Sequence, residues 1–366
     1  MSNFYDIAVI GAGMAGASIA AELAPHASVL LAEAEAAPGY HTTGRSAAFW
    51  EECYGGPGIV PLTLASGPYL RDLGMLTRRG ALYIARSGAE DQAARFESSF
   101  AGTGVHIARL GRAALERAVP GILPGWDIAI AEPACSDIDV AALHQHYLAL
   151  ARRGGVDLRC GARLHAAERE GDAGWRLSFG AGGEARARVL VDAAGAWADD
   201  VAAMAGARGL GIAPLRRTVA QLRMDPAVPA DLPLVLDLAG DFYFKPENGR
   251  LWLSPHDETP SAPCDAAPEE LDVAIAIDRL ERVVDWRIEA IERKWAGLRS
   301  FAPDRLPVYG FDPARADFFW FAGQGGYGIQ TAPAAARLAA QLLLGRGRDA
   351  MTEALDPARY SPARFA

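Results

Sequence analysis

The sequence contains few cysteines, and none of them is paired at a metal-binding spacing. Cys53, Cys135, Cys160 and Cys264 are scattered along the chain without a C-x-x-C motif. This pattern disfavours a structural zinc site or a disulfide framework. We expect four reduced thiols in a cytoplasmic protein.

Long apolar runs and an excess of basic residues are also missing. No apolar run approaches the roughly 18–20 residues that span a bilayer, so no transmembrane segment is predicted. The first residues lack a basic region and a small-residue cleavage site, which argues against a secretory signal. With 36 Lys and Arg against 45 Asp and Glu, the net charge of −9 argues against a nucleic-acid partner. No metal site is expected either, because His144 and His146 lie two apart on a predicted helix and face different ways.

The chain does contain strand and helix patterns typical of an α/β fold. Its 366 residues suggest two intimately joined domains. A short apolar strand at 5–10, a glycine turn, an Ala-rich helix and a second buried strand at 28–33 form one β-α-β unit. The segments 187–206 and 318–345 again follow the order strand, small-residue turn and helix. Further strands are expected at 81–86, 156–168, 174–179, 218–224 and 250–255, and helices at 112–119, 139–155 and 268–284.

These segments predict a Rossmann-like nucleotide-binding domain interrupted by a second domain. The final strand-turn-helix segment resembles the first, which suggests that the chain returns to its starting sheet. We assign 1–80, 140–212 and 310–366 to a discontinuous cofactor-binding domain. An inserted α+β substrate domain is expected from 81–139 and 213–309.

A G-x-G-x-x-G motif directly follows the first strand. Gly11, Gly13 and Gly16 suit a tight turn, close approach of the backbone to a pyrophosphate, and close helix-to-strand packing. The N-terminus of the following helix offers free N–H groups and partial positive charge. Glu33, at the end of the second strand, is placed to accept hydrogen bonds from ribose hydroxyls. The motif predicts a dinucleotide site without deciding between FAD and NAD.

Five segments together resemble the FAD-dependent D-amino acid oxidase/dehydrogenase family, and most of all its bacterial D-arginine dehydrogenases. They are DIAVIGAGMAGASIAAELA, PGYHTTGRSAAF, VLVDAAGAWADDVA, WAGLRSFAPDRLPVYG and FFWFAGQGGYGIQTAP, in the family's order. The resemblance implies FAD as the cofactor and a substrate domain built on an antiparallel sheet. It also implies oxidation of an amino acid to an imino acid by hydride transfer from Cα to flavin N5, followed by hydrolysis to a 2-oxo acid and ammonia.

The same resemblance assigns a set of residues to the cofactor. The glycine motif and Glu33 would bind the ADP half, the 41–48 loop would wrap the pyrophosphate and flavin, and the helix expected near Ile329 would stabilise negative charge on the reduced ring. The implied FAD contacts are Gly11, Gly13, Ala15, Gly16, Glu33, Ala34, His41, Thr42, Thr43, Gly44, Arg45, Ser46, Ala47, Ala48, Leu164, Ala194, Gly195, Gly325, Gly326, Tyr327, Gly328, Ile329 and Gln330. No cysteine lies in GQGGYGIQ, where some relatives carry a covalent flavin, so we expect FAD to be noncovalent.

On the substrate side, the resemblance assigns catalytic roles to Arg299, Tyr243 and Arg217. An amino acid carboxylate in a buried pocket needs a planar, always-charged donor, and Arg provides a bidentate fork. Arg299 is the expected main clamp, Tyr243 a hydroxyl donor and Arg217 a second cation, with Arg216 as the alternative to Arg217. No side chain is identified as a general base.

Two departures from the D-arginine dehydrogenase pattern concern the substrate side chain. Ala81 stands where that pattern has a glutamate that pairs with the basic substrate, and Phe49 replaces a histidine. An uncompensated buried cation would cost several kcal/mol. We therefore expect a neutral, hydrophobic D-amino acid, bound among Tyr54, Phe49, Ala81, Leu234, Leu236 and Gln330.

Other functions stay open at this point. The same carboxylate clamp would suit an N-methyl amino acid or a 2-hydroxy acid, and the chain could also be a FAD-binding subunit without its own turnover. The electron acceptor, whether a quinone, another carrier or O2, cannot be decided from the sequence.

Overall fold

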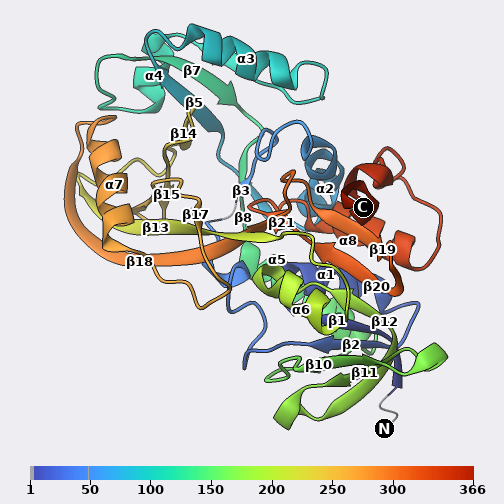
Figure 1. Cartoon of the computed structure of the whole chain (residues 1–366). Helices are drawn as coiled ribbons and strands as arrows, with labels where there is room; N and C mark the ends of the chain where they lie inside the picture. Colours follow the sequence, from blue (N-terminus) through green and yellow to red (C-terminus); the bar gives the residue numbers. More distant parts are fainter. Residues whose placement is uncertain (1–3, 48) are drawn as a thin grey trace.

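The fold of the computed structural model consists of two large β-sheets that are flanked by helices, and a small third sheet (Figure 1). The structure describes residues 4–47 and 49–366. Ala48, one of the expected FAD contacts, lies outside the described residues.

The first large sheet has eight strands and carries the nucleotide-binding topology. Its main order is β10-β11-β12-β1-β2-β9, with β20 on β12 and β19 on β20. The pairs β1–β12, β1–β2, β2–β9 and β12–β20 are parallel. The strands are β1 (Phe4–Ile10), β2 (Val29–Ala32), β9 (Asp157–Arg159), β10 (Ala166–Arg169), β11 (Trp175–Ser178), β12 (Glu184–Asp192), β19 (Val308–Asp312) and β20 (Arg315–Ala322).

Helices cover both faces of this sheet, as the apolar strands predict. Ile7 and Val9 of β1 enter one core with α1 (Met14–Leu23), α5 (Val140–Arg153) and α8 (Ala332–Leu343). Ala8 and Ile10 enter the opposite core with α6 (Ala198–Met204). Strand side chains alternate between faces, so a strand buried on both sides must be apolar throughout.

The second large sheet has ten strands and is antiparallel except for the β14–β5 pair. Its path is β21-β18-β13-β16-β15-β14-β5-β7-β6, with β17 on β13. The strands are β5 (Ala81–Arg86), β6 (Ala108–Leu110), β7 (Trp126–Glu132), β13 (Ala213–Asp225), β14 (Leu234–Asp237), β15 (Tyr243–Glu247), β16 (Arg250–Ser254), β17 (Thr259–Pro260), β18 (Arg287–Phe301) and β21 (Gln324–Gly325). Helices α3 (Glu90–Phe100), α4 (Arg112–Ala118) and α7 (Glu270–Glu281) flank it (Figure 1).

The chain passes directly from one large sheet to the other at a glycine turn. β20 belongs to the first sheet, and β21 follows it within two residues and pairs with β18 of the second. A third sheet of β3 (Phe49–Trp50), β8 (Ser136–Ile138) and β4 (Leu76–Arg78) and the helix α2 (Val60–Asp72) lie nearby. The ends of both large sheets therefore converge on the segments expected to bind the cofactor.

Two local expectations need correction. The helix expected near Ile329 begins at Ala332, because 326–331 form turns in which Thr331 N–H donates to the Tyr327 carbonyl. No strand was expected directly after the 41–48 loop, but Phe49 and Trp50 form a short one that pairs with Asp137 and Ser136. In contrast, the helix expected at 139–155 is present as α5, and Asp139 caps it, because its carboxylate accepts from Ala142 N at 2.9 Å.

None of the helices described in residues 4–47 and 49–366 is long and apolar enough to cross a bilayer. The four cysteines are all free, as expected, with Cys53 and Cys135 buried and Cys160 and Cys264 exposed.

Candidate active site

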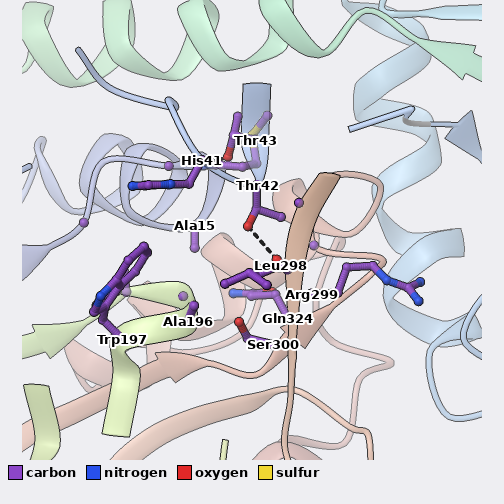
Figure 2. Close-up of a pocket in the computed structure, with 18 of the residues that line it drawn as sticks. Ala15, His41, Thr42, Thr43, Ala196, Trp197, Leu298, Arg299, Ser300 and Gln324 are labelled. Carbon is purple, nitrogen blue, oxygen red and sulfur yellow. Dashed lines mark hydrogen bonds between the residues drawn. The ribbon is translucent and has the colours of Figure 1, made fainter. Parts of the chain in front are cut away.

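A cavity of about 780 Å³ lies where the two large sheets meet. Such a volume is in the upper part of the range of about 300–1,000 Å³ for small-molecule sites. Trp197 and His41 lie at one end, and Arg299 lies at the other (Figure 2). The expected residues that line it are Gly11, Gly13, Ala15, Glu33, Ala34, His41, Thr42, Thr43, Arg45, Ser46, Ala47, Phe49, Tyr54, Leu164, Ala194, Gly195, Arg217, Leu236, Tyr243, Arg299, Gly325, Gly326, Gly328, Ile329 and Gln330.

The glycine motif packs as its spacing predicts. Gly11 has φ +95°, and a Cβ there would lie 2.6 Å from the Ala193 carbonyl oxygen. A Cβ on Gly16 would lie 1.7 Å from the Gly11 carbonyl oxygen, so Gly16 permits helix-to-strand packing and does not itself line the cavity. In the described chain, the amides of Gly13 and Ala15 have no partner. These amides are available to a phosphate at the N-terminus of α1.

Glu33 is held rigidly at the end of β2. One of its carboxylate oxygens accepts from Ala12 N at 2.8 Å and the other from Glu35 N at 3.0 Å. A carboxylate has about four acceptor positions, so both oxygens keep capacity for a ribose hydroxyl. The acid therefore also orients the glycine turn, a role that the sequence motif does not reveal.

The loop after β2 connects the glycine motif to the second sheet. Thr43 Oγ1 accepts from Met14 N at 2.9 Å, and Thr42 Oγ1 donates to the Leu298 carbonyl at 2.6 Å (Figure 2). Gly44 does not line the cavity, because it packs against Gly39. A Cβ added to Gly44 would lie 2.8 Å from the Gly39 carbonyl oxygen. The guanidinium of Arg45 is bound to the Asp265 carboxylate and the Ala266 carbonyl, so it is not directed at a phosphate. These contacts fix the loop against the second sheet.

One end of the cavity offers flat aromatic surface that sequence reasoning did not identify. The rings of His41 and Trp197 lie 4.8 Å apart, and His41 Nε2 is 3.1 Å from Glu35 Oε1. Trp197 follows the expected Ala194–Gly195 turn by two residues, and this proximity is the only sequence signal for it. Leu164, Arg163 and Met204 also line this end.

The other cofactor segment is the turn before α8. In the described chain, the amides of Gly328, Ile329 and Gln330 have no hydrogen-bond partner. The Gln330 side chain turns away from the cavity, because its amide contacts Glu51 N, the Glu51 carbonyl and Thr63 Oγ1. Tyr327 does not line the cavity, and its hydroxyl donates to the Arg305 carbonyl. The turn therefore presents backbone donors rather than these two side chains.

Arg299 lies on β18 and has one unused donor. Its Nη1 donates to the Tyr54 hydroxyl at 2.6 Å, and its Nη2 donates to Glu258 Oε1 at 2.9 Å. Its Nε is buried and has no partner among the described residues. A Cβ on Gly326 would lie 2.1 Å from the Tyr54 hydroxyl and 2.7 Å from Arg299 Nη1, so only glycine leaves room for this pair.

Arg217 and Tyr243 complete the polar side of the pocket. Arg217 donates from Nε to the Asp257 carbonyl at 2.8 Å, and its guanidinium carbon lies 5.9 Å from the centre of the Tyr243 ring. Burial raises the pKa of Tyr243, so its hydroxyl stays protonated. Arg216 is not an alternative, because it points to the other face of β13 and pairs with Glu269 and Asp272.

The loop between β16 and β17 adds two residues that the sequence analysis missed. His256 lines the cavity, and its Nδ1 lies 2.6 Å from the Gly240 carbonyl oxygen. Burial, helped by the charge of Arg217, lowers the pKa of His256 to about 4, so the ring is neutral near pH 7. A carbonyl can only accept, so Nδ1 carries the proton and Nε2 keeps a lone pair. The second residue, Glu258, contacts the arginines.

The remaining wall is aromatic and apolar. The rings of Phe49 and Tyr54 lie 5.6 Å apart, and those of Phe49 and Tyr243 lie 5.9 Å apart. Leu236 lines the pocket beside them. Ala81 and Leu234 were expected to line it but do not; they pair across β5 and β14 and lie in the core behind this wall.

A buried pair of acidic side chains lies behind the aromatic wall. Cys53 N donates to Glu51 Oε1 at 3.0 Å and to Glu132 Oε2 at 3.2 Å, and Glu52 N donates to Glu132 Oε1 at 2.7 Å. The Tyr83 hydroxyl also donates to Glu51. Burial and the nearby Glu132 charge raise the pKa of Glu51 well above its ordinary value, so Glu51 holds a proton. Neither carboxyl group lines the cavity.

Comparison with known proteins identifies the family. The family described as FAD dependent oxidoreductase (DAO) matches residues 6–342. The chain belongs to this family. The hydrogen cyanide synthase subunit HcnC of Pseudomonas aeruginosa is 24% identical over 360 residues, which cover 85% of each chain.

Solved structures share the fold. Glycine oxidase from Geobacillus kaustophilus has a TM-score of 0.84 at 24% identity and covers 98% of both chains. L-Proline dehydrogenase from P. horikoshii has a TM-score of 0.85 at 21% identity, covering 100% of this chain and 98% of its own. These likenesses support the α/β fold with a Rossmann-like FAD-binding part.

The cofactor of this FAD-dependent oxidoreductase is FAD, and the cavity suits it. The free amides of Gly13 and Ala15 face the position of a phosphate at a helix N-terminus. Glu33 has acceptor capacity for a ribose, and His41 and Trp197 provide ring surface for a base. No cysteine lines the cavity in the described chain, and the noncovalent binding of FAD stays a prediction.

Proposed function

We propose that this oxidoreductase converts a small, neutral, hydrophobic D-amino acid to its imino acid, which water hydrolyses to a 2-oxo acid and ammonia. The observation that carries the proposal is the combination of a buried arginine that lines the cavity, Arg299, and an aromatic wall without a lining carboxylate. The D configuration rests on the resemblance of HTTGRSAAF and WAGLRS to D-arginine dehydrogenases. A cytoplasmic location, suggested by the four free cysteines, belongs to the same proposal.

Within this proposal, the protein's own residues bind and orient the substrate. Arg299 binds the substrate carboxylate, with Arg217 and Tyr243 on the same polar side of the cavity. Phe49, Tyr54 and Leu236 surround the apolar side chain and exclude water. Bound FAD supplies the hydride-accepting chemistry. A basic substrate side chain would be disfavoured, because Glu51 is protonated and sealed behind Phe49.

His256 is the candidate hydrogen-bond acceptor for the substrate amine, a position for which the sequence offered no residue. Its Nε2 lone pair is free because Nδ1 donates to Gly240. The Tyr243 ring lies 5.8 Å from the imidazole ring, and the charges of Arg217, Glu258 and Arg305 act on it. In His256→Asn, kcat/KM should fall at least tenfold at pH 7. The loss should persist at pH 9.5, because the neutral ring orients the amine at both pH values. An unchanged kcat/KM would restrict His256 to a packing role.

A second candidate function is that of a catalytically silent FAD-binding subunit. The match to a protein named as a hydrogen cyanide synthase subunit, over 85% of both chains, supports assembly with other chains. N-Methyl amino acids and 2-hydroxy acids remain alternative substrates, since Arg299 can bind any of these carboxylates. Relatives named as glycine oxidase and L-proline dehydrogenase support an amine donor over an alcohol.

Anaerobic flavin bleaching with a substrate panel tests these functions together. The FAD-loaded protein is mixed with D-amino acids, L-amino acids, N-methyl amino acids and 2-hydroxy acids, and oxygen is then admitted. We expect D-leucine, D-methionine or D-phenylalanine to bleach the flavin fastest. Bleaching by 2-hydroxy acids alone would contradict the proposal, and no bleaching by any acid would favour the silent subunit. The rate of recovery with oxygen separates an oxidase from a dehydrogenase that needs a quinone or another carrier.

A further inference from the structure

A carboxylate of the protein itself lies among the arginines of the pocket. Glu258 Oε1 accepts from Arg299 Nη2 at 2.9 Å and from Arg305 Nη2 at 2.7 Å. Arg217 Nη2 lies 3.6 Å from the same oxygen. Three guanidinium groups therefore converge on a single carboxylate oxygen.

The arginines that face the pocket are fixed, whereas Glu258 lies at the margin of the site. The side chains of Arg299 and Arg217 are 9% and 7% exposed, and that of Glu258 is 33% exposed. Glu258 belongs to the short connection between β16 and β17 and does not line the cavity. It can therefore act on a substrate through its charge without occupying the space of the substrate side chain.

The charges around the clamp balance to a small excess. Arg217, Arg299 and Arg305 face Glu258 and Asp257, and Asp257 accepts from Thr218 N at 2.7 Å and Thr218 Oγ1 at 2.9 Å. His256 is neutral near pH 7. One net positive charge remains, and a single substrate carboxylate neutralises it. A second anionic group would be repelled by the Glu258 charge, which lies against the buried guanidinium of Arg299.

We propose that Glu258 is a specificity-determining residue that restricts the pocket to ligands with one carboxylate. The proposal deepens the proposed function and rests on it for the reaction. The effect of the Glu258 charge on ligand binding does not require turnover. Glu258→Gln keeps the shape of the side chain and removes its negative charge. The variant should therefore no longer repel a second anionic group of the ligand.

Isothermal titration of FAD-loaded protein with butanoate and succinate tests this proposal. Both ligands have four carbons, and they differ in carrying one or two carboxylates. The wild type should bind butanoate at least tenfold more tightly than succinate. In Glu258→Gln, succinate affinity should rise at least tenfold while butanoate affinity changes less than threefold. Glu258→Asp, which keeps the charge, should retain the wild-type preference.

Glu269→Gln is the matched control, because Glu269 pairs with Arg216 on the outer face of β13. It should leave both affinities unchanged. An equal gain for both ligands in Glu258→Gln would mean that Glu258 competes for the clamp, and an equal loss would mean that it only positions Arg299. Either result overturns the proposal. Failure of the proposed function would look different, because no amino acid would bleach the flavin while the shift in binding preference persisted.

Discussion

At the scale of single residues, Arg299 is the side chain on which substrate binding depends most. Its three polar nitrogens are divided among Tyr54, Glu258 and an unsatisfied position, and the side chain is almost fully buried. Arginine at a buried carboxylate site is hard to replace, because its planar fork and permanent charge act together.

Arg299→Met should reduce kcat/KM at least 100-fold, because it leaves the substrate carboxylate without its partner. This loss corresponds to about 3 kcal/mol of transition-state stabilisation. Steady-state kinetics with D-leucine would measure the loss. Arg216→Met is the control, since Arg216 points to the opposite face of the same sheet. Equal losses in both variants would show that the effect arises from damage to the sheet and not from substrate binding.

Gly326 carries a second prediction at this scale. In Gly326→Ala, the new Cβ would overlap the Tyr54 hydroxyl and Arg299 Nη1. The Arg299–Tyr54 contact should break, raising KM at least tenfold, while FAD content stays near that of the wild type. Gly111→Ala, at a position with no atom near the added Cβ, should leave KM unchanged. An unchanged KM in Gly326→Ala would show that the contact between Arg299 and Tyr54 does not contribute to substrate binding.

At the scale of elements, β7 and the segment after β3 place two carboxyl groups in the core. Glu51 and Glu132 are both fully buried, and the raised pKa of Glu51 means that the pair holds a proton. The unfolded chain releases that proton above a pH of about 4.3, whereas the folded chain keeps it. Stability from this pair is therefore present at low pH and declines as the pH rises toward the folded pKa.

Glu51→Gln should remove this decline, because the amide keeps the hydrogen bonds without a titrating proton. Denaturant unfolding should give similar stabilities for the two proteins at pH 4.5 and a growing advantage for the variant toward pH 8. Glu97→Gln, which removes a partly exposed partner of Arg109, should show no such trend. A constant difference across this pH range would mean that Glu51 is ionised in the fold.

The elements also show where sequence patterns succeed and fail. The glycine motif and the apolar strands around it could be predicted, because the tight contact between Gly16 and the Gly11 carbonyl joins residues only five apart in the sequence. The start of α8 was wrong by three residues, because turn hydrogen bonds continue to Thr331. The resemblance placed Ala81 and Leu234 at the substrate, but both lie in the core behind the wall. Leu236 shares a strand face with Leu234 and does line the cavity, so position along the strand decides this contact.

At the scale of the whole molecule, the site depends on contacts between distant parts of the chain. Arg299 meets Tyr54 across 245 residues, and Arg45 meets Asp265 across 220. No local pattern specifies such pairs, which is why His256, Glu258 and Trp197 were missed although the FAD-binding fold was not. The domain boundaries proposed from the sequence remain a prediction.

The central claim is that the pocket selects a neutral D-amino acid. The most direct measurement is kcat/KM of the FAD-loaded protein for D-leucine, L-leucine and D-arginine with an artificial electron acceptor. We predict that D-leucine exceeds both of the others by at least tenfold, because the wall of Phe49, Tyr54 and Leu236 has no free carboxylate for a cation. A preference for D-arginine or for L-leucine would contradict the account.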